Sequence, residues 1–547
     1  MYFANRNVPT EWTYSSGKNY ADPFNEVQLD VVVTCPDGSE QRVPAFWAGE
    51  NSWHVRYSSS QIGTHRLRSI CSDTDNESLH GQEGSLEVTA YTGKNPLYKH
   101  GRLQIAPDQR HLQHQDGTPF FWLADTWWMA FCKRMTWPQG FMELAADRVA
   151  KGFTVIQIIA GLYPDMPPFD ERGANEAGFP WEKDFSRINP AYFDLVDLRM
   201  AHLIQSGFVP TLVGFWGYFL GFAGAEVLKK HWRYLIARYG AYPVVWCCAG
   251  EALMPYYQSE EFEEMLRLPA GEAWLPAVKR AAWSDMMRFI HATDPYHNPL
   301  TIHPTQHGTD QVDDPSTMDI DWLQTGHGGY QSLAPTMDIL EDALGRQPKM
   351  PVIVSEVCYE GILEGSREEI QRFLFWTCLL SGAAGHTYGA NGIWQVNTRE
   401  QPHGASPHGI AWGNLPWQDA YKLPGSGQLG LGKRLLEQFE WWRFEVHPEW
   451  IDPHQTAKDR LSSYVAGIPG QVRLIYMPVS AIRFGRDDQP FLKALEPGIH
   501  YNASWFDPKS GDRVPIAVIS GDANGDYQLP KPPILQDWVL ILEVAAS

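Results

Sequence analysis

The chain has 547 residues, enough for several domains, and 44% of them are hydrophobic, which provides material for large cores. Its formal net charge of −20 argues against nucleic acid or an anionic membrane surface as a partner, because both attract clusters of lysine and arginine. No apolar run approaches the length of a membrane span, so we expect no association with a membrane.

The N-terminus and the cysteines bear on the cellular compartment. The first residues lack a basic region followed by an apolar core, so no signal peptide is visible. The seven cysteines are an odd number and are scattered without the spacing of metal ligands. We therefore expect reduced thiols, no metal or other cofactor, and a cytoplasmic location unless a leader has been removed.

Residues 1–94 have the pattern of an all-β domain. Short apolar or alternating runs are separated by Gly, Ser and Asn, and Cys35-Pro-Asp-Gly38 is a turn signal. Regular short strands with turns between them favour a β-sandwich. The predicted strands are residues 28–34, 42–47, 53–57, 63–70 and 84–90.

Residues 95–447 alternate between apolar strands and amphipathic helices. Eight such alternations predict an α/β fold, a (β/α)8 TIM barrel, with only a weak helix after the fifth strand. The predicted strands are residues 120–125, 154–159, 209–215, 244–249, 300–303, 322–325, 352–355 and 385–388. The predicted helices are residues 139–151, 191–205, 225–239, 274–292, 367–381 and 431–442.

Residues 448–547 return to a β pattern. Strands are predicted at residues 472–477, 501–507 and 538–543, with Pro-Gly and Asp-Gly turns, and they indicate a small C-terminal β-sandwich. No low-complexity linker separates the three units, so we expect them to pack rigidly. The sequence leaves a homo-oligomer open.

Two glutamates follow buried strands of the predicted barrel. The apolar run 352–354 ends in Ser355 and Glu356, and Pro-Val-Val-Trp-Cys-Cys-Ala-Gly-Glu at residues 243–251 has the same form. The C-terminal ends of barrel strands carry the chemistry in this fold, so we expect Glu251 and Glu356 to face each other. Each one alone could instead be a capping or ion-paired acid at the start of a helix.

Other strand ends supply amides, imidazoles and aromatic rings. Amides and imidazoles hydrogen-bond hydroxyl groups, and aromatic rings stack on the C–H faces of sugars, so this set predicts a carbohydrate as partner. We find no pair of metal-spaced histidines, nucleophile elbow, phosphate loop or dinucleotide motif. The predicted substrate-binding residues are Asp125, Trp127, Trp128, Gln157, Trp216, His303, Gln324, His327, His386, Tyr388 and Trp394.

Two facing glutamates suit the hydrolysis of a glycosidic bond, which needs one carboxyl group on each side of the bond. By position, Glu251 is the expected acid/base, with a raised pKa, and Glu356 is the expected nucleophile, which must stay ionised. We expect Tyr388 or His386, on the next strand, to donate a hydrogen bond to Glu356.

Some of these side chains have a second interpretation. Asp125 could cap the following helix, although we favour a bond to a substrate hydroxyl. Trp127 and Trp128 are adjacent, so one of them is expected to face the pocket and the other the surrounding shell. Glu360 and Glu364 lie beyond the strand end and are expected to be solvated or to brace a loop.

Several motifs of the predicted barrel carry a resemblance to a known family. They are Pro119-Phe-Phe-Trp-Leu-Ala-Asp-Thr-Trp-Trp128, Lys151-Gly-Phe-Thr-Val-Ile-Gln157, Asp321-Trp-Leu-Gln-Thr-Gly-His-Gly328, Gly382-Ala-Ala-Gly-His-Thr-Tyr-Gly389 and Gly392-Ile-Trp-Gln395. On these motifs, residues 101–445 resemble the barrel family that includes the apiosidases of glycoside hydrolase family 140, also described as the domain of unknown function 4038. The resemblance implies a glycosidase that acts on plant-type glycans.

The flanking parts carry shorter motifs. Tyr20-Ala-Asp-Pro-Phe24, Val43-Pro-Ala-Phe-Trp47 and Trp53-His-Val-Arg-Tyr57 resemble the immunoglobulin-like module described as the domain of unknown function 5060. Trp505-Phe-Asp-Pro and the final Asp537-Trp-Val-Leu-Ile-Leu resemble the small β-domain often attached to such barrels.

One motif departs from that family. Its fourth strand usually leads to Gly-Gly-Asp, whereas this chain has Ala249-Gly-Glu251, with an acid longer by one methylene. Together with the loop from Met254 to Leu268, this difference predicts an altered subsite, so apiose specificity does not carry over. The leading hypothesis is a retaining exo-glycosidase for a plant or microbial glycan, such as an apiose- or arabinose-type furanoside. The alternatives are a non-catalytic carbohydrate-binding protein and a transglycosylase that uses the same carboxylates.

Overall fold

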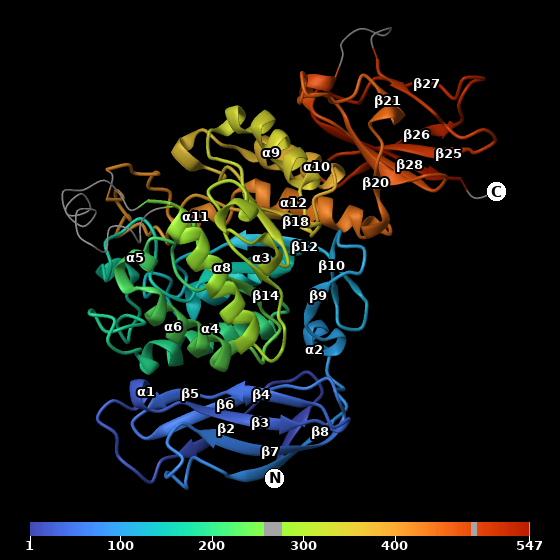
Figure 1. Cartoon of the computed structure of the whole chain (residues 1–547). Coiled ribbons are helices and arrows are strands. Elements are labelled where there is room, and N and C mark those ends of the chain that lie inside the picture. Colours follow the sequence, from blue (N-terminus) through green and yellow to red (C-terminus); the bar gives the residue numbers. More distant parts are fainter. Residues whose placement is uncertain (256–275, 408, 483–488, 546–547) are drawn as a thin grey trace.

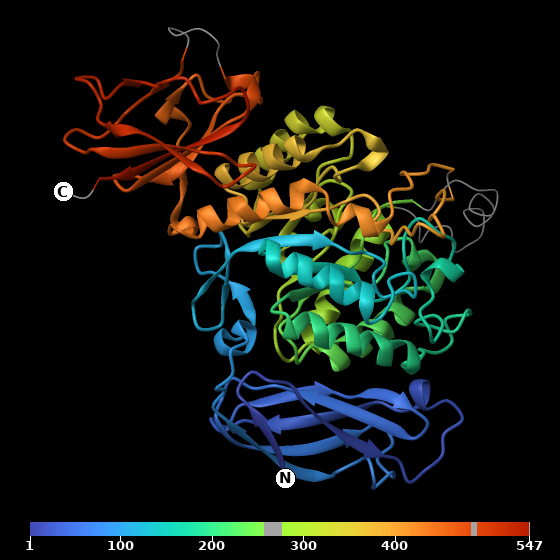
Figure 2. The ribbon, with the colours of Figure 1, turned by 180° about the vertical axis from the view of Figure 1, so that it is seen from behind.

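The computed structural model describes residues 1–255, 276–407, 409–482 and 489–545. Figure 1 shows a central barrel with the N-terminal β-sheets on one side and the C-terminal β-sheets on the other. The view from behind in Figure 2 shows the same order, with the two sets of sheets apart from each other. Within the described residues, no helix is both long enough and apolar enough to cross a membrane.

The barrel has eight parallel strands, as the sequence predicted. Their order in the sheet is β16-β15-β14-β13-β12-β19-β18-β17, so the ring is nearly closed and its seam lies between β16 and β17. Backbone contacts still cross this seam, because the Asp319 amide donates to Leu300 at 2.9 Å and the Gln324 amide donates to Gln306 at 3.1 Å. The strands are β12 (Trp122–Thr126), β13 (Val155–Ile159), β14 (Val209–Val213), β15 (Val245–Cys247), β16 (Leu300–Thr301), β17 (Asp321–Gln324), β18 (Val352–Glu356) and β19 (Gly385–Tyr388).

Helices cover the outside of the barrel, and every residue of strands such as β13 is buried on both faces. After β16 the chain forms only the short 3-10 turns η3 (Gly308–Gln311) and η4 (Pro315–Thr317), in agreement with the weak helix signal there. The surrounding helices are α3 (Gln139–Lys151), α4 (Pro190–Gln205), α6 (Ala225–Tyr239), α8 (Pro276–Thr293), α9 (Leu333–Gly345), α10 (Glu368–Leu380) and α12 (Pro424–Leu436).

Two helices differ from the sequence prediction. Helix α9 was not predicted, and α12 runs from Pro424 to Leu436 rather than over the predicted residues 431–442. The first half of α12 is rich in glycine, which lowers helix propensity and hid its start. These glycines allow close packing, because a Cβ on Gly430 would lie 2.0 Å from the Lys151 carbonyl oxygen and one on Gly432 would lie 2.5 Å from Phe375.

The N-terminal strands form one sheet in the order β1-β8-β7-β3-β4 and a second in the order β2-β6-β5, which share a buried core. This agrees with the predicted sandwich, to which β1 and β2 are additions that the sequence pattern did not reveal. The predicted strand 42–47 was wrong, because it spans the break between β4 and β5, which belong to different sheets. The strands are β1 (Tyr2–Asn5), β2 (Thr10–Ser15), β3 (Leu29–Thr34), β4 (Glu40–Pro44), β5 (Phe46–Gly49), β6 (Ser52–Tyr57), β7 (Gly63–Cys71) and β8 (Glu83–Thr89).

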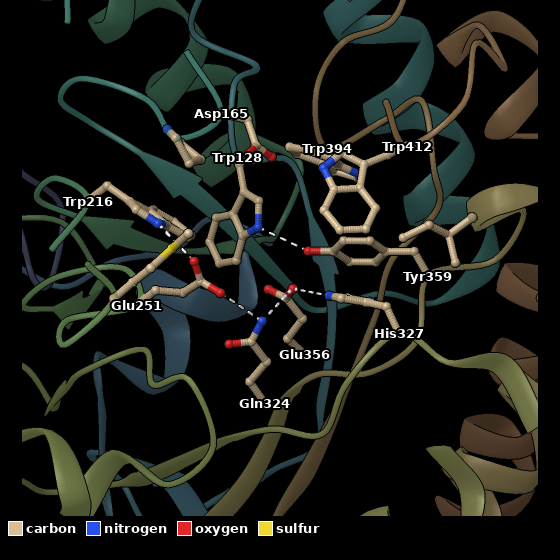
Figure 3. Close-up of a pocket in the computed structure, with 13 residues that line it drawn as sticks. Trp128, Asp165, Trp216, Glu251, Gln324, His327, Glu356, Tyr359, Trp394 and Trp412 are labelled. Atoms are coloured by element: carbon tan, nitrogen blue, oxygen red, sulfur yellow. Dashed lines mark hydrogen bonds and ion pairs between the residues drawn. The ribbon is translucent and has the colours of Figure 1, made fainter. Parts of the chain in front are cut away.

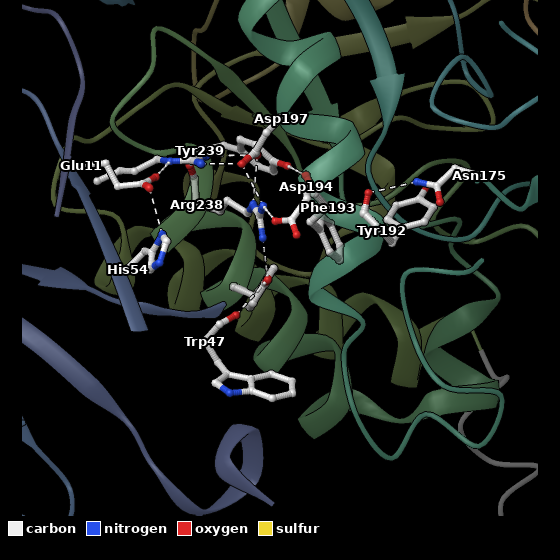
Figure 4. Close-up of polar contacts among 12 residues, drawn as sticks. Glu11, Trp47, His54, Asn175, Tyr192, Phe193, Asp194, Asp197, Arg238 and Tyr239 are labelled. Carbon is white, nitrogen blue, oxygen red and sulfur yellow. Dashed lines mark hydrogen bonds and ion pairs between the residues drawn. The ribbon is translucent and has the colours of Figure 1, made fainter. Parts of the chain in front are cut away.

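A buried ion-pair network joins the N-terminal sheets to the barrel. Arg56 on β6 lies 3.1 Å from Asp197 on α4, and Arg238 on α6 donates to the same carboxylate at 2.8 Å (Figure 4). Burial disfavours the charge on Arg56, but the contact with Asp197 outweighs it and raises the Arg56 pKa. Since each of these buried charges has a partner, the network fixes the orientation of the sheets on the barrel.

The C-terminal strands form a sheet in the order β20-β22-β23-β28-β25-β26 and a smaller one in the order β21-β24-β27. Arg372 on α10 anchors them to the barrel, because its Nε and Nη2 atoms each lie 2.8 Å from a different oxygen of the buried Asp537 carboxylate. The strands are β20 (Glu445–Val446), β21 (Ile451–Asp452), β22 (Tyr464–Ile468), β23 (Val472–Met477), β24 (Phe491–Leu492), β25 (Tyr501–Phe506), β26 (Arg513–Ile519), β27 (Tyr527–Gln528) and β28 (Trp538–Val544).

Candidate active site

A pocket with a volume of about 280 Å³ opens at the C-terminal end of the barrel strands (Figure 3). This volume is near the lower end of the roughly 300–1,000 Å³ of small-molecule sites. Aromatic rings and carboxylates dominate its lining. Seven of the residues predicted from the sequence line it: Trp128, Trp216, Glu251, Gln324, His327, Glu356 and Trp394.

Glu356 ends strand β18 and is buried. His327 Nε2 lies 2.9 Å from its Oε1 atom, and His303 Nε2 lies 3.1 Å from its Oε2 atom, the latter an ion-pair contact without hydrogen-bond alignment. Burial alone would raise the pKa of Glu356, but the contacts with His303 and His327 outweigh it and hold the pKa well below its ordinary value. Glu356 is therefore ionised across the physiological pH range.

Glu251 follows strand β15 and has a backbone φ of 38°, an uncommon conformation for a residue other than glycine. Trp216 Nε1 donates to its Oε2 atom at 3.1 Å, and Gln324 Nε2 donates to its Oε1 atom at 3.0 Å. Burial, followed by the negative charge of Glu356, raises the pKa of Glu251. The two glutamates thus have opposite pKa shifts.

Gln324 connects the two glutamates. Its Nε2 atom, which lies 3.0 Å from Glu251, also donates to Glu356 Oε1 at 3.3 Å. The two Oε1 atoms therefore cannot be farther apart than the sum of these distances. A carboxylate with a lowered pKa and a carboxyl group with a raised pKa, this close together, suit attack on one atom of a bond and protonation of the other.

Two glycines allow aromatic rings to reach the pocket. A Cβ on Gly250 would lie 2.1 Å from the Trp216 ring, and a Cβ on Gly389 would lie 2.0 Å from the Tyr359 ring. Either methyl group would displace its ring, since real Cβ contacts are never this short. Gly250 thus leaves space for the Trp216 indole, which donates a hydrogen bond to the Glu251 carboxyl group.

Other predicted site residues lie outside the pocket. Asp125 is fully buried and accepts hydrogen bonds from Arg148 at 2.6 Å and from Trp127 Nε1 at 2.7 Å. Arg148 belongs to α3, so the Asp125 side chain faces the helices rather than the barrel interior. Trp127 packs on Phe141 of the same helix, whereas Trp128 lines the pocket. The prediction that one of the two tryptophans faces the pocket matches this arrangement.

The partners expected for Glu356 were wrong. Tyr388 donates to Glu360 at 2.5 Å, and His386 is buried against Phe375 with neither ring nitrogen hydrogen-bonded among the described residues. Burial lowers the pKa of His386 to about 3, so this side chain is neutral. Glu360 is buried and accepts hydrogen bonds from the Gly425 amide, so it is not solvated but braces the start of α12.

Gln157 and His303 are both fully buried beside the pocket without lining it. Gln157 donates to Thr387 at 2.9 Å inside the barrel. His303 lies behind Glu356, and its Nδ1 atom is 3.3 Å from the Ser355 hydroxyl, which donates to the Leu323 carbonyl. These two residues are too deep to contact a ligand in the pocket.

Met254 lines the pocket and begins the loop that was expected to alter the subsite. Sequence reasoning missed the other lining residues, which are Pro164, Asp165, Tyr359, Ile362 and Trp412. Tyr359 lies only three residues after Glu356, accepts a hydrogen bond from Trp128 Nε1 at 3.0 Å and stacks on His327. Asp165 and Trp412 belong to long loops, whose positions no strand pattern indicates. The predicted loop between Met254 and Leu268 lies largely outside the described residues.

The remaining chemistry of the described part is simple. Within it, no group of three or more His, Cys, Asp or Glu side chains could hold a metal ion. All seven cysteines are buried and unpaired. The pocket lining itself combines carboxyl groups with aromatic rings.

Comparisons with known proteins identify a family and similar folds. The family described as apiosidase-like, catalytic domain, matches residues 106–443, and the domain of unknown function DUF5060 matches residues 8–72. A solved structure described as a glycoside hydrolase is 21% identical, with a TM-score of 0.65 over 83% of this chain and 98% of its own. A family 5 glycoside hydrolase from Bacteroides vulgatus is 20% identical, with a TM-score of 0.62 over 82% and 95% of the two chains.

A second protein from Bacteroides vulgatus, provisionally described as a glycoside hydrolase, is similar along its whole length. It is 15% identical, with a TM-score of 0.70 over 100% of both chains. At such identities, these structures support the fold alone. The comparison with curated proteins found no match.

Proposed function

Because the chain belongs to the apiosidase-like family of glycoside hydrolases, we propose that it is a retaining, exo-acting glycosidase with Glu356 as nucleophile and Glu251 as acid/base. The observation that carries this proposal is the pair of opposite pKa shifts on two carboxyl groups that share one donor, Gln324. Glu356 stays ionised and can attack, whereas the raised pKa of Glu251 favours the protonated form that a general acid needs.

The reaction follows from these protonation states. A Glu356 oxygen bonds to the anomeric carbon while the glycosidic C–O bond breaks, and the leaving oxygen takes the proton of Glu251. Glu251, now ionised, removes a proton from a water molecule, whose oxygen attacks the same carbon. The ester to Glu356 then breaks, and both carboxyl groups return to their starting states.

Two features support the stereochemistry and the exo action. The Oε1 atoms of Glu251 and Glu356 are closer than the roughly 6.5–9.5 Å that separates the carboxyl groups of inverting enzymes, because Gln324 contacts both at 3.0 and 3.3 Å. A pocket of about 280 Å³ suits a terminal sugar better than the middle of a chain.

The test is the configuration of the first product. Aryl furanosides and pyranosides, including apiosides and α- and β-arabinosides, are offered to the protein, and the hydrolysed one is followed by proton NMR. We expect the released sugar to appear first in the anomeric configuration of the substrate. Initial formation of the opposite anomer would contradict the retaining mechanism, and endo cleavage of an oligosaccharide would contradict exo action.

A further inference from the structure

Glu251 is the first residue of a tight backbone turn. The Met254 amide donates to the Glu251 carbonyl at 2.8 Å, which closes residues 251–254 into one turn. The positive φ of Glu251 costs free energy in a residue with a Cβ, so it persists only where the surroundings impose it. The direction of the Glu251 side chain therefore depends on the groups that hold this turn in place.

Two side chains of helix α8 donate to the carbonyls of this turn. Lys279 Nζ lies 2.9 Å from the Met254 carbonyl oxygen, and Trp283 Nε1 lies 2.9 Å from the Ala252 carbonyl oxygen. The two side chains are four residues apart and so project from the same face of the helix. Helix α8 thus contacts the turn at its middle and at its end.

Other elements hold the middle of the turn. The Ala252 amide donates to the His303 carbonyl at 3.2 Å, and the Leu253 amide donates to Gln311 Oε1 at 3.1 Å. A Cβ on Gly217 would lie 2.5 Å from the Ala252 Cα, so the loop after β14 packs directly on the turn. The middle is therefore fixed from several sides, whereas the Met254 carbonyl at the end is held by Lys279.

Lys279 is unusual because it is a lysine that is only 1% exposed. Burial lowers its pKa to about 8, so the ammonium form still predominates at neutral pH. An ammonium group makes a charge-assisted hydrogen bond, which is stronger than one between neutral groups. This strong bond is made to Met254, a residue that lines the pocket and lies three positions after Glu251.

We propose that Lys279 is a positioning residue for the acid/base, and that it directs the Glu251 carboxyl group through the backbone of the turn 251–254. The inference rests on the proposed glycosidase function and adds a residue to it. If the Met254 carbonyl loses its donor, the turn can relax toward an ordinary φ. The Glu251 carboxyl group then leaves the place from which it protonates the departing oxygen, and small displacements of a catalytic group cost much of the rate.

Lys279→Met tests this role, because it removes the donor and keeps a long unbranched side chain. We measure kcat/KM, which reports formation of the covalent intermediate, for two aryl glycosides of the same sugar. With a poor leaving group, which needs a proton, kcat/KM should fall at least tenfold. With a dinitrophenyl leaving group, which needs none, it should stay within threefold of the wild type.

Arg280→Met is the matched control. Arg280 is the next residue of the same helix, and its Nε atom donates to the Asp310 carbonyl at 2.8 Å rather than to the turn. This variant should match the wild type with both substrates. A merely structural role for Lys279 would lower both rates to the same extent, so the ratio of the two rates separates positioning from stability.

Trp283→Phe is a second variant, which decides the question if Lys279→Met does not fold. It removes the donor to Ala252, keeps an aromatic ring, and should show the same dependence on the leaving group. Equal losses with both substrates, or an unchanged rate with the poor leaving group, would overturn the proposal.

Glu251→Gln distinguishes this failure from that of the proposed function. If its loss depends on the leaving group and that of Lys279→Met does not, the positioning role alone is wrong. If the loss in Glu251→Gln does not depend on the leaving group, the acid/base role of Glu251 is wrong, and the positioning role fails with it.

Discussion

Two clusters of buried carboxyl groups lie near the C-terminal end of the barrel strands, and they differ in what their charges face. The pocket cluster consists of Glu251, Glu356, Gln324, His303 and His327. The helix-side cluster, between the strands and the helices, consists of Asp125, Arg148, Tyr388 and Glu360. Both combine acids with donors from several elements, but the pocket cluster supplies lining residues of the cavity in Figure 3 and the helix-side cluster supplies none.

In the helix-side cluster each acid has fixed partners. Arg148 Nε lies 2.6 Å from Asp125, both side chains are 0% exposed, and Tyr388 donates to Glu360. In the pocket cluster two acids share a single amide, and the proximity of Glu356 raises the pKa of Glu251. Removing one partner from a buried pair is costly, so such an acid keeps its partners, whereas two acids that share one amide beside a cavity have the shifted pKa values that suit proton exchange with a ligand.

The largest expected effect comes from Glu356→Gln, which removes the nucleophile and keeps the side-chain shape. Hydrolysis of any active aryl glycoside should fall by at least about 1,000-fold, because no carboxylate remains to form the covalent intermediate. Steady-state rates and the thermal midpoint are measured together, and we expect the variant to fold.

Glu360→Gln makes the same substitution in the helix-side cluster and is the matched control. It should leave the rate within about threefold, since Glu360 is not among the residues that line the active-site pocket. Near wild-type hydrolysis by Glu356→Gln, or equal losses in the two variants, would contradict the distinction between the clusters.

Glu251→Gln should have the next largest effect, and the effect should depend on the leaving group. With a poor leaving group, we expect a loss of about 100- to 10,000-fold, because the departing oxygen is no longer protonated. With a dinitrophenyl leaving group, which needs no proton, formation of the intermediate should be nearly normal. Equal losses with both leaving groups would assign Glu251 a role other than that of general acid.

The same variant tests the pKa assignment. On the basic side, hydrolysis by the wild type should decline when the pH rises through the Glu251 pKa, which lies above the ordinary glutamate pKa of 4.5. On the acidic side hydrolysis should persist well below pH 4.5, because the Glu356 pKa is lowered. The basic limb should disappear in Glu251→Gln, and a basic limb that persists would point to another titrating group.

The contrast between the clusters also explains what sequence reasoning could recover. The ends of the barrel strands can be predicted from the sequence, since apolar runs stop at Glu356 and near Glu251. In a (β/α)8 barrel the C-terminal ends of the strands meet, which brings these two residues together. The direction in which a side chain points cannot be predicted in the same way, because every residue of a strand such as β19 is buried and its pattern does not alternate. His386 and Tyr388 were therefore assigned to the interior, although they face the helices.

Loops and close packing limited the prediction in other ways. Helix α3 carries a clear periodic pattern and matched its predicted bounds. Helix α12 contains glycines, which weaken the helix signal in the sequence. Two of them are needed because Lys151 and Phe375 lie too close for a side chain at those positions. Tyr359 reaches the pocket only because Gly389, on a different loop, leaves space for its ring. Such pairings between distant residues leave no local signal in one sequence.

The smallest effect on hydrolysis is expected for Glu360→Gln, yet this variant should change how stability depends on pH. Burial raises the pKa of Glu360 from 4.5 to about 7, so the folded protein binds a proton that the unfolded chain releases between these values. The stabilisation is fully present below about pH 4.5 and is lost as the pH rises through about 7. The free energy of unfolding should fall by an amount on the order of 3 kcal/mol over this range.

We therefore expect the thermal midpoint of the wild type to decline between pH 5 and pH 8 by more than that of Glu360→Gln, which has no proton to lose there. The exposed Glu364, four residues along the same loop, gives the control variant Glu364→Gln, which should follow the wild type. Identical pH dependence in all three proteins would show that Glu360 titrates normally. The helix-side cluster would then hold an ordinary carboxylate, and the contrast with the pocket would rest on Asp125 and Arg148 alone.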